Sequence, residues 1–371
     1  MLNHLQHKSA METNNNINPN VIPESLEGQT FSDITFNLDE PEFVGDDAMI
    51  DDPSVNEENH PYFIEGPASS YTYADLQKMV IPVFAASNEL SLANTDIAKA
   101  VYSAAAKCFG LENLSPLEFR GSHLRKSRII SAETLKMTNN DVEAGDTNSY
   151  LERLACCFTV KNYARTIADQ PTDLCIGFVR SYTSTNLYST KAPEKLSIWC
   201  STRVRVCSNL CLSVSGLKEE ISVLSPLDVY KETEDLIQSY LRTVDEENKV
   251  LEGLCSTRIT TTQFKLLTGS LRYYMSLDLQ QRKELPEMDI QLGDAQTFEA
   301  CRLFINSKWG LREGEDSIDL FRLLNCYTEA VKNSYLHNFL PKQRSVYTMI
   351  KNLQMVLQGN TENPYAWLLA A

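Results

Sequence analysis

The sequence lacks the motifs of several large classes of enzyme. It contains no Gly-x-x-x-x-Gly-Lys-Ser/Thr phosphate loop, no Gly-x-Gly-x-x-Gly dinucleotide fingerprint and no Gly-x-Ser-x-Gly nucleophile turn. Glycine is scarce, with 14 among 371 residues, which disfavours nucleotide-dependent chemistry of these common kinds. We therefore expect no cofactor, and the sequence leans toward a protein without enzymatic activity.

Long apolar runs and complete metal motifs are also missing. No stretch of 18 apolar residues could span a bilayer, and the N-terminus lacks the apolar segment of a secretory signal. Cys207-x-x-x-Cys211 resembles half of a zinc site, but no second pair of ligands follows. We expect a cytoplasmic protein with no membrane partner and no metal, whose ten cysteines are mostly buried, reduced thiols.

The net charge of −15 is concentrated at one end of the chain. Residues 1–65 contain fourteen acids and a single base, Lys8, and so carry −13 of that charge. Mutual repulsion and an Asn-rich stretch at 14–20 predict a disordered acidic tail over residues 1–65. Apolar islands at 31–36 and 43–44 leave open whether the tail docks on a partner or on the rest of the protein. The remainder is nearly neutral, so the low pI does not argue against nucleic-acid binding.

The pattern behind the tail predicts an α+β fold. Two helical segments at 72–83 and 97–108 precede apolar runs separated by turn signals at 156–160, 174–182, 196–199, 204–207 and 211–214. From residue 226 the period is helical, with helices expected at 227–251, 263–275, 294–307, 317–331 and 346–357. We expect a domain at 66–223 with N-terminal helices and a central, mostly antiparallel β-sheet, and a helical C-terminal half at 224–371 packed on it.

A short basic segment is the most specific local feature. Arg120, His123, Arg125, Lys126 and Arg128 lie within nine residues that contain no acid. Such a set suits contacts to phosphates, which position a protein on nucleic acid without reading its sequence. The alternative is a solvated loop whose charges pair with the acidic tail or with nearby glutamates.

Two arginines and several aromatic residues of the β-rich region could extend this surface. Arg203 and Arg205 alternate with valines, which places both arginines on one face of a strand. Tyr182, Tyr188 and Trp199 supply rings on which bases could stack. The sequence thus predicts a nucleic-acid site made of the basic segment, Arg203 and Arg205.

Seven segments between residues 117 and 369 carry a family resemblance. They are Arg120-Gly-Ser-His123 with Arg128, Val179-Arg-Ser-Tyr182 with Asn186-Leu-Tyr-Ser189, Lys195-Leu-Ser-Ile, Val206-Cys-Ser-Asn209-Leu-Cys211, Thr262-Gln-Phe264 to Tyr273, Asn333-Ser-Tyr335 to Phe339, and Tyr365-Ala-Trp367. Together they resemble a family classed as a domain of unknown function, carried on plasmids, conjugative transposons and phages of the Bacteroidota. The stretch Val206-Cys-Ser-Asn209 is also similar, more distantly, to phage- and plasmid-like proteins with a Val-Cys-x-Asn strand motif. Leu124 departs from the family pattern, because the family often has proline there. The resemblance implies a mobile genetic element and supplies no activity.

Three functions follow from these observations. The leading hypothesis is a non-enzymatic accessory protein of a mobile element that contacts DNA, preferably single-stranded, through the seven basic residues. The first alternative is a protein-interaction or anti-defence module whose acidic tail, residues 1–65, mimics nucleic acid toward a host or element protein. The second alternative is an enzyme centred on His123, which would have to lie in a polar pocket beside a carboxylate.

Overall fold

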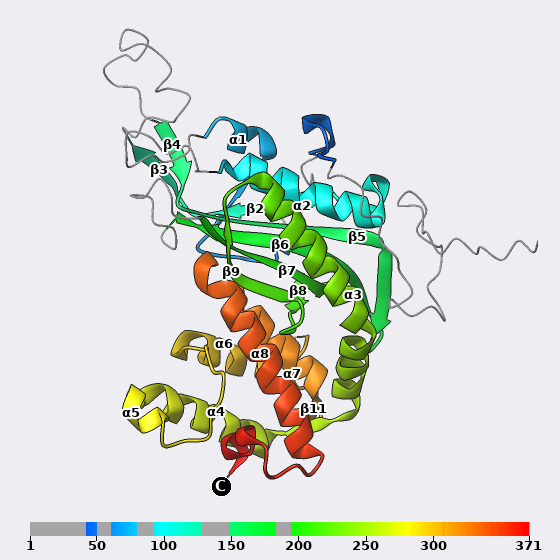
Figure 1. The fold of residues 1–371 in the computed structure, drawn as a ribbon. Helices are drawn as coiled ribbons and strands as arrows, with labels where there is room; N and C mark the ends of the chain where they lie inside the picture. Colours follow the sequence, from blue (N-terminus) through cyan, green and yellow to red (C-terminus); the bar gives the residue numbers. More distant parts are fainter. Residues whose placement is uncertain are drawn as a thin grey trace, which may run out of the picture.

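A seven-stranded antiparallel sheet forms the middle layer of the molecule (Figure 1). The computed structural model describes residues 42–49, 61–79, 92–127, 148–182, 194–306 and 308–370. The strands lie in the order β1-β2-β5-β6-β7-β8, and β9 pairs with the other half of β7. Their bounds are β1 Ser69–Tyr71, β2 Glu118–Gly121, β5 Arg153–Ile167, β6 Gln170–Ser181, β7 Glu194–Val204, β8 Asn209–Cys211 and β9 Leu217–Val223. The predicted α+β class with an antiparallel central sheet is confirmed.

One face of the sheet is covered by the N-terminal helices and the first part of a long helix. These are α1 (Tyr73–Gln77), α2 (Asn94–Phe109), the 3-10 turn η4 (Leu111–Asn113) and α3 (Pro226–Ser256). Helix α2 covers the segment expected to be helical at 97–108, and its apolar residues Ile97, Val101, Ala104 and Ala105 are buried. Its alanines are small enough to let α2 lie close against α3 and the sheet, and together these elements bury the first hydrophobic core.

The other face is covered by the C-terminal helices, as expected for the helical half. They are α4 (Thr261–Ser276), α5 (Leu279–Arg282), α6 (Asp294–Asn306), α7 (Leu320–Val331), α8 (Leu336–Leu357) and the 3-10 helix η7 (Pro364–Leu369). Two short strands, β10 (Arg258–Thr260) and β11 (Ser317–Asp319), pair beside them. Helix α7 is buried on nearly every side, so it is the centre of the second core.

Helix α3 joins the two cores. Its 31 residues span about 46 Å. Leu236 and Tyr240 pack into the first core, whereas Leu251 and Leu254 belong to the second. The helix begins with a capping box between Ser225 and Asp228. Figure 1 shows α3 passing the edge of the sheet from one layer to the other.

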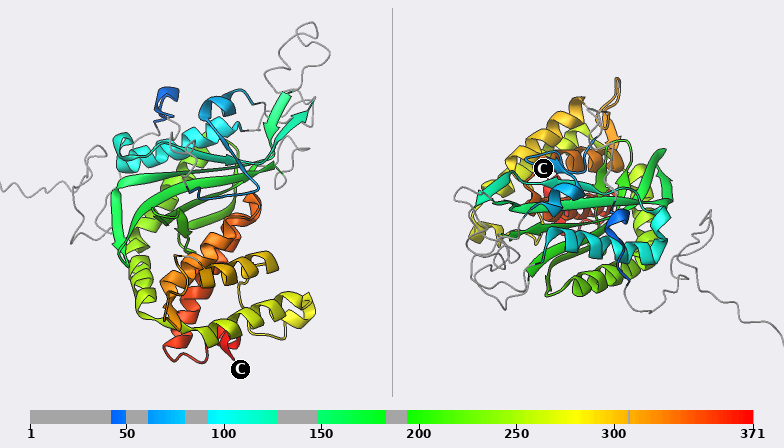
Figure 2. Two further views of the ribbon diagram at one scale, coloured as in Figure 1. Left: turned by 180° about the vertical axis from the view of Figure 1, so that it is seen from behind. Right: turned by 90° about the horizontal axis from the view of Figure 1, so that it is seen from above.

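Residues 61–68, here called the strap, lie between the sheet and the C-terminal helices (Figure 2). Phe63 and Ile64 are completely buried, and the Phe63 ring centroid is 6.1 Å from those of Trp199 and of Phe339. The predicted end of the tail at residue 65 therefore falls inside packed sequence. The sequence did not indicate this packing, because Phe63 and Ile64 are only two adjacent apolar residues in an acidic stretch and show neither helical nor strand periodicity.

Residues 42–49 also contact the body, although the sequence placed them in the tail. The ring of Phe43 lies 5.5 Å from that of Tyr230, and the Val44 amide donates to Ser103 Oγ at 2.9 Å. Asp46, in the 3-10 turn η2 (Asp46–Ala48), pairs with Lys99 at 2.5 Å. Of the two possibilities for the island at 43–44, the structure shows docking on the protein's own α2–α3 layer.

The described residues carry no sign of a bilayer span or a metal cluster. None of the described helices combines the length and apolar composition needed to cross a membrane. Among the same residues, no three His, Cys, Asp or Glu side chains lie close enough to share a metal ion. All ten cysteines are described and free of disulfides, and seven of them are buried.

Candidate nucleic-acid interface

Arg120 is a buried residue of β2 that holds the strap. Its guanidinium donates to the carbonyls of Ile64 at 2.9 Å, Glu65 at 2.8 Å and Ala68 at 2.9 Å. The Tyr62 ring lies over it with its centroid 3.9 Å away, and burial lowers the pKa of Arg120. With 4% of its surface exposed and these bonds made, Arg120 is placed to fasten the strap rather than to reach a phosphate.

The Arg203 side chain, at the end of β7, also binds groups within the protein. Its Nη2 donates to Glu118 Oε2 at 2.9 Å and to Ser208 Oγ at 2.7 Å, and Nη1 lies 3.6 Å from Cys157 Sγ. Burial alone would lower the pKa of Arg203, but Glu118 raises it above its ordinary value. Glu118 in turn accepts from the Phe63 amide at 3.2 Å, so this ion pair also fixes the strap.

Arg205 and Arg203 meet in one polar cavity of about 170 Å³. Nε and Nη2 of Arg205 both donate to the Asp173 carboxylate at 2.6 Å, while about half of the Arg205 side chain is exposed. The structure thus brings together the two strand arginines that the sequence placed on one face. Each has its own carboxylate, so the cavity, also lined by Ser115 and Thr159, carries no net charge from these four groups.

The turn after β7 joins the sheet to α7. The Ser208 backbone is left-handed, with φ of 56°, and Asn209 donates to the carbonyl and side-chain oxygen of Asn325 at 3.2 and 3.0 Å. The ammonium of Lys332, fully buried, donates to the Cys207 carbonyl. Burial raises the pKa of the Cys207 and Cys211 thiols. This segment, which carries part of the family resemblance, is a packed junction.

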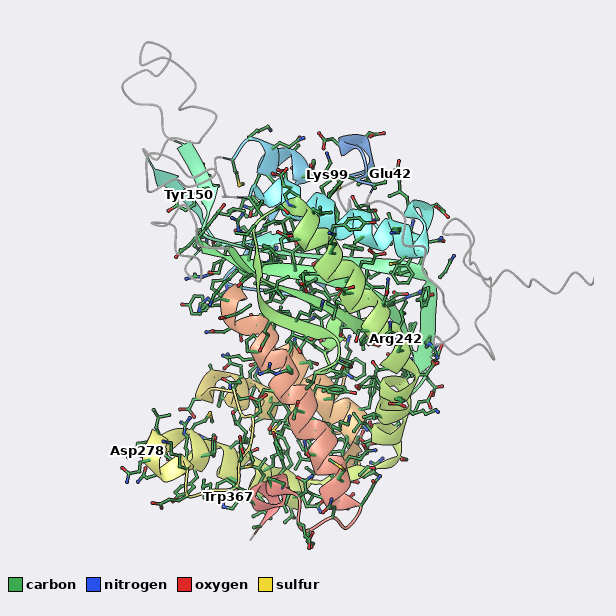
Figure 3. All side chains as sticks on the ribbon, viewed as in Figure 1. Glu42, Lys99, Tyr150, Arg242, Asp278 and Trp367 are labelled. Atoms are coloured by element: carbon green, nitrogen blue, oxygen red, sulfur yellow. The ribbon has the colours of Figure 1, made fainter. Side chains whose placement is uncertain are left out.

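The rest of the basic segment lies on a separate two-stranded ribbon, here called the arm. Strands β3 (Leu124–Ser127) and β4 (Asn148–Leu151) pair antiparallel, with Arg125 opposite Tyr150 and Lys126 opposite Ser149. Figures 1 and 2 show the arm projecting from one end of the main sheet, and Tyr150 marks it in Figure 3. His123 is exposed in the link between β2 and β3, and Arg128 lies outside the described residues.

The aromatic residues expected to stack on bases have mixed positions. Trp199 is completely buried in the second core, and Tyr182 is buried with the Arg180 guanidinium 4.1 Å from its ring centroid. Tyr150 of the arm approaches Tyr182 edge-on, at 6.2 Å between centroids. Tyr188 lies outside the described residues.

A groove that sequence reasoning missed lies beside the base of the arm. It measures about 290 Å³ and is bounded by β6, β7, β9 and the first turns of α8. Its lining includes apolar Val179, Leu336 and Leu340 and polar Lys195, Glu220 and His337. Three of the segments that carry the family resemblance supply Val179, Lys195, Leu336 and His337, but these segments are far apart in the chain, so only the fold reveals the groove.

The comparisons with known proteins agree with the resemblance at the level of the family. Neither a curated protein nor a solved structure matches the chain. One family model matches residues 43–369, starting within the docked segment 42–49 and ending in η7. Its description reads "Domain of unknown function, B. Theta Gene description (DUF3871)". Because this match covers most of the 371 residues, the chain belongs to the DUF3871 family.

Proposed function

We propose that this protein is a non-enzymatic accessory factor that contacts single-stranded nucleic acid through the arm. The observation that carries the proposal is the position of Arg125 and Lys126 on the two-stranded ribbon that projects from one end of the main sheet. Basic residues supply phosphate contacts that position a protein on nucleic acid without reading its sequence. A role in a mobile genetic element is implied only by the family resemblance.

The structure narrows the set of residues that the proposal uses. Arg120 and Arg203 are buried in bonds to the protein, and Arg205 shares a bidentate pair with Asp173. The proposed interface therefore consists of His123, Arg125, Lys126 and Arg128. We expect these four residues to make only a few contacts with phosphates. His123 is exposed and does not line either cavity described above, so an enzyme centred on it gains no support and we do not propose one.

Replacing three cations of the basic segment should weaken binding in a salt-dependent way. We expect the variant Arg125→Ala/Lys126→Ala/Arg128→Ala to bind a single-stranded oligonucleotide roughly tenfold more weakly at low salt. Its slope of log affinity against log salt should become shallower by about 0.7 for each phosphate that is no longer neutralised, because fewer counterions are released on binding. Fluorescence anisotropy at several salt concentrations measures both quantities.

The matched control removes the same charge elsewhere. Lys231, Arg242 and Lys249 are exposed on α3, and Figure 3 shows Arg242 far from the arm. Their triple alanine variant should keep both affinity and slope. Equal losses in the two triple variants would show that only total charge matters, and absence of any binding to single- or double-stranded DNA or RNA at low salt would rule the proposal out.

The acidic N-terminus is the second candidate contact, and the structure changes how it must be tested. Removing residues 1–65 would delete Phe63 and Ile64 from the second core, so loss of function would report unfolding. A deletion of residues 1–41 removes six acids and one base without touching described contacts. We expect this deletion to leave the thermal midpoint unchanged and to keep or raise oligonucleotide affinity, measured by calorimetry and anisotropy. Loss of binding would instead place the contact in the tail.

A further inference from the structure

The groove lies at the same end of the sheet as the arm. Ser181, which lines the groove, pairs with Arg153 in the ladder between β6 and β5. Arg153 follows the last residue of β4 by two positions, and the Tyr182 amide donates to the Glu152 carbonyl at 2.9 Å. A strand of nucleic acid held by the arm would therefore reach the groove directly.

The size of the groove restricts what can enter it. At about 290 Å³ it is at the lower end of the range of small-molecule pockets. Val179 of the sheet and Leu336, Leu340 and Pro341 of α8 supply an apolar lining for a flat ring. Because the volume suits one ring system with its sugar, the groove can take a single nucleotide unit and not a folded chain.

A β-bulge places carboxylates in the wall of the groove. Register shifts between Leu196 and Ile198, where β9 contributes Glu219 and Glu220, and the Glu220 backbone is left-handed with φ of 49°. Bulges re-aim side chains and are frequent beside binding sites. Glu220 Oε2 accepts from Lys195 at 3.1 Å, and both side chains are solvent-accessible. Among the described residues, no hydrogen-bond partner is seen for Glu220 Oε1, which is therefore available to accept from a ligand.

The second carboxylate is held in place by Arg344. This guanidinium, on α8, bridges Glu219 and Asp289, the latter at 3.3 Å. Glu219 and Glu220 thus give the wall hydrogen-bond acceptors, with Lys195 paired to Glu220 and Arg344 shared between Glu219 and Asp289. Such a wall favours a neutral ligand edge that donates hydrogen bonds.

An aromatic pair lies next to the groove. Tyr335 is more than half exposed, and its ring stacks against that of His337 at 6.0 Å between centroids. Burial and then Arg153 lower the pKa of His337, so that its imidazole is neutral at pH 7. A neutral aromatic surface is suited to stacking on the base that neighbours the one in the groove.

We propose that the groove binds one unpaired nucleobase that carries an exocyclic amine, namely cytosine, adenine or guanine. The ring lies between Val179 and α8, and the amine donates to Glu220. The phosphate lies outside, toward Arg153 and the arm. This inference rests on the proposed function for its biological setting, but the groove's preference among mononucleotides can be measured without the arm.

Calorimetric titration of the full chain with dCMP and dUMP tests the chemistry of the site. Cytosine has an amine at position 4 where uracil has a carbonyl, and uracil alone carries a hydrogen at N3. At position 4 the cytosine amine donates to the carboxylate whereas the uracil carbonyl is repelled by it, so dCMP should bind roughly tenfold more tightly. Glu220→Gln, an isosteric change at an exposed side chain, should abolish that preference. Equal affinities for dCMP and dUMP, or no binding of either at millimolar concentration, would overturn the inference.

A second variant tests the location. Gln291 lines the groove and is exposed, so Gln291→Trp should obstruct it and remove dCMP binding. Gln280→Trp, at an exposed surface hollow on α5, is the matched control and should bind dCMP like the wild type. Unchanged dCMP binding in Gln291→Trp, with both variants folded by circular dichroism, would place the nucleotide elsewhere.

The arm variant separates this inference from the proposed function. Arg125→Ala/Lys126→Ala/Arg128→Ala should lose oligonucleotide affinity and keep the affinity for dCMP. If the wild type binds dCMP but no oligonucleotide, the proposed function fails and the groove stands. If it binds oligonucleotides but neither mononucleotide, the groove fails and the arm stands.

Discussion

Glu118→Ala is expected to lower the free energy of unfolding by about 3 kcal/mol, because it leaves a buried guanidinium without its carboxylate. Glu118 is 2% exposed at its side chain and Arg203 is 10% exposed. The loss falls at the low end for a broken buried pair, since Ser208 still accepts from Arg203 and the adjoining cavity admits water. The variant also removes the acceptor of the Phe63 amide. Urea denaturation followed by circular dichroism measures the change.

Two further variants show whether charge is the cause. Asp173→Ala should cost only about 1 kcal/mol, because its partner Arg205 is half exposed and can be hydrated. The double variant Glu118→Leu/Arg203→Met, which removes both charges, should be more stable than Glu118→Ala. A double variant as unstable as the single one would contradict the explanation and point to lost packing instead.

Phe63→Ala is expected to destabilise the protein by about 3–5 kcal/mol, since it empties the space between Trp199 and Phe339. The strap is otherwise held by Arg120 and by the Lys332 carbonyl, which accepts from the amides of Glu65 and Gly66 at 3.1 and 3.4 Å. These bonds keep the strap in place, so the cavity cannot collapse easily. The unfolding free energy again gives the measurement.

Phe43→Ala is the natural control for this second variant. Phe43 is also in the acidic N-terminal region, but it is 40% exposed where it touches Tyr230. Its loss should cost less than about 1 kcal/mol. Similar costs for both phenylalanines would mean that the strap is not part of the folding core.

The internal contacts around Glu118 and Phe63 also bear on how the family resemblance is understood. Arg120, Ser208 and Asn209 belong to segments that carry it, and each binds another part of the same chain. These polar and charged residues suggest a functional site in the sequence, but in the structure they join the strap, the sheet and α7. The groove and the arm are therefore the places where binding of other molecules remains to be measured.

Several elements could be predicted because their signals are local. Helix α2 has an apolar stripe, and α3 has Ser225, Pro226 and Asp228 at its start. The strand β6 was visible as a continuous apolar run, typical of a strand covered on both faces. Such features depend only on neighbouring residues, and the α+β class followed from them.

Other elements escaped prediction because their causes are not local. Helix α8 begins ten residues before the expected position at 346 and contains Pro341. The helix tolerates this proline by leaving the His337 carbonyl without its usual helical donor. Strand β9 is an edge strand rich in Lys and Glu, which protects an edge from pairing with other chains but conceals it in the sequence.

The basic residues show most clearly what each level decides. By itself the sequence determined that cations cluster at 120–128 and recur at 203 and 205, that the acids gather at the N-terminus, and that an α+β body follows. Only the tertiary structure decided which cations have internal partners. Arg120 and Arg203 lie next to carbonyls and carboxylates contributed from more than 50 residues away, whereas Arg125 and Lys126 follow the chain onto the arm. An arginine's sequence context does not reveal these partners, because burial and pairing are set by residues that meet only when the chain folds.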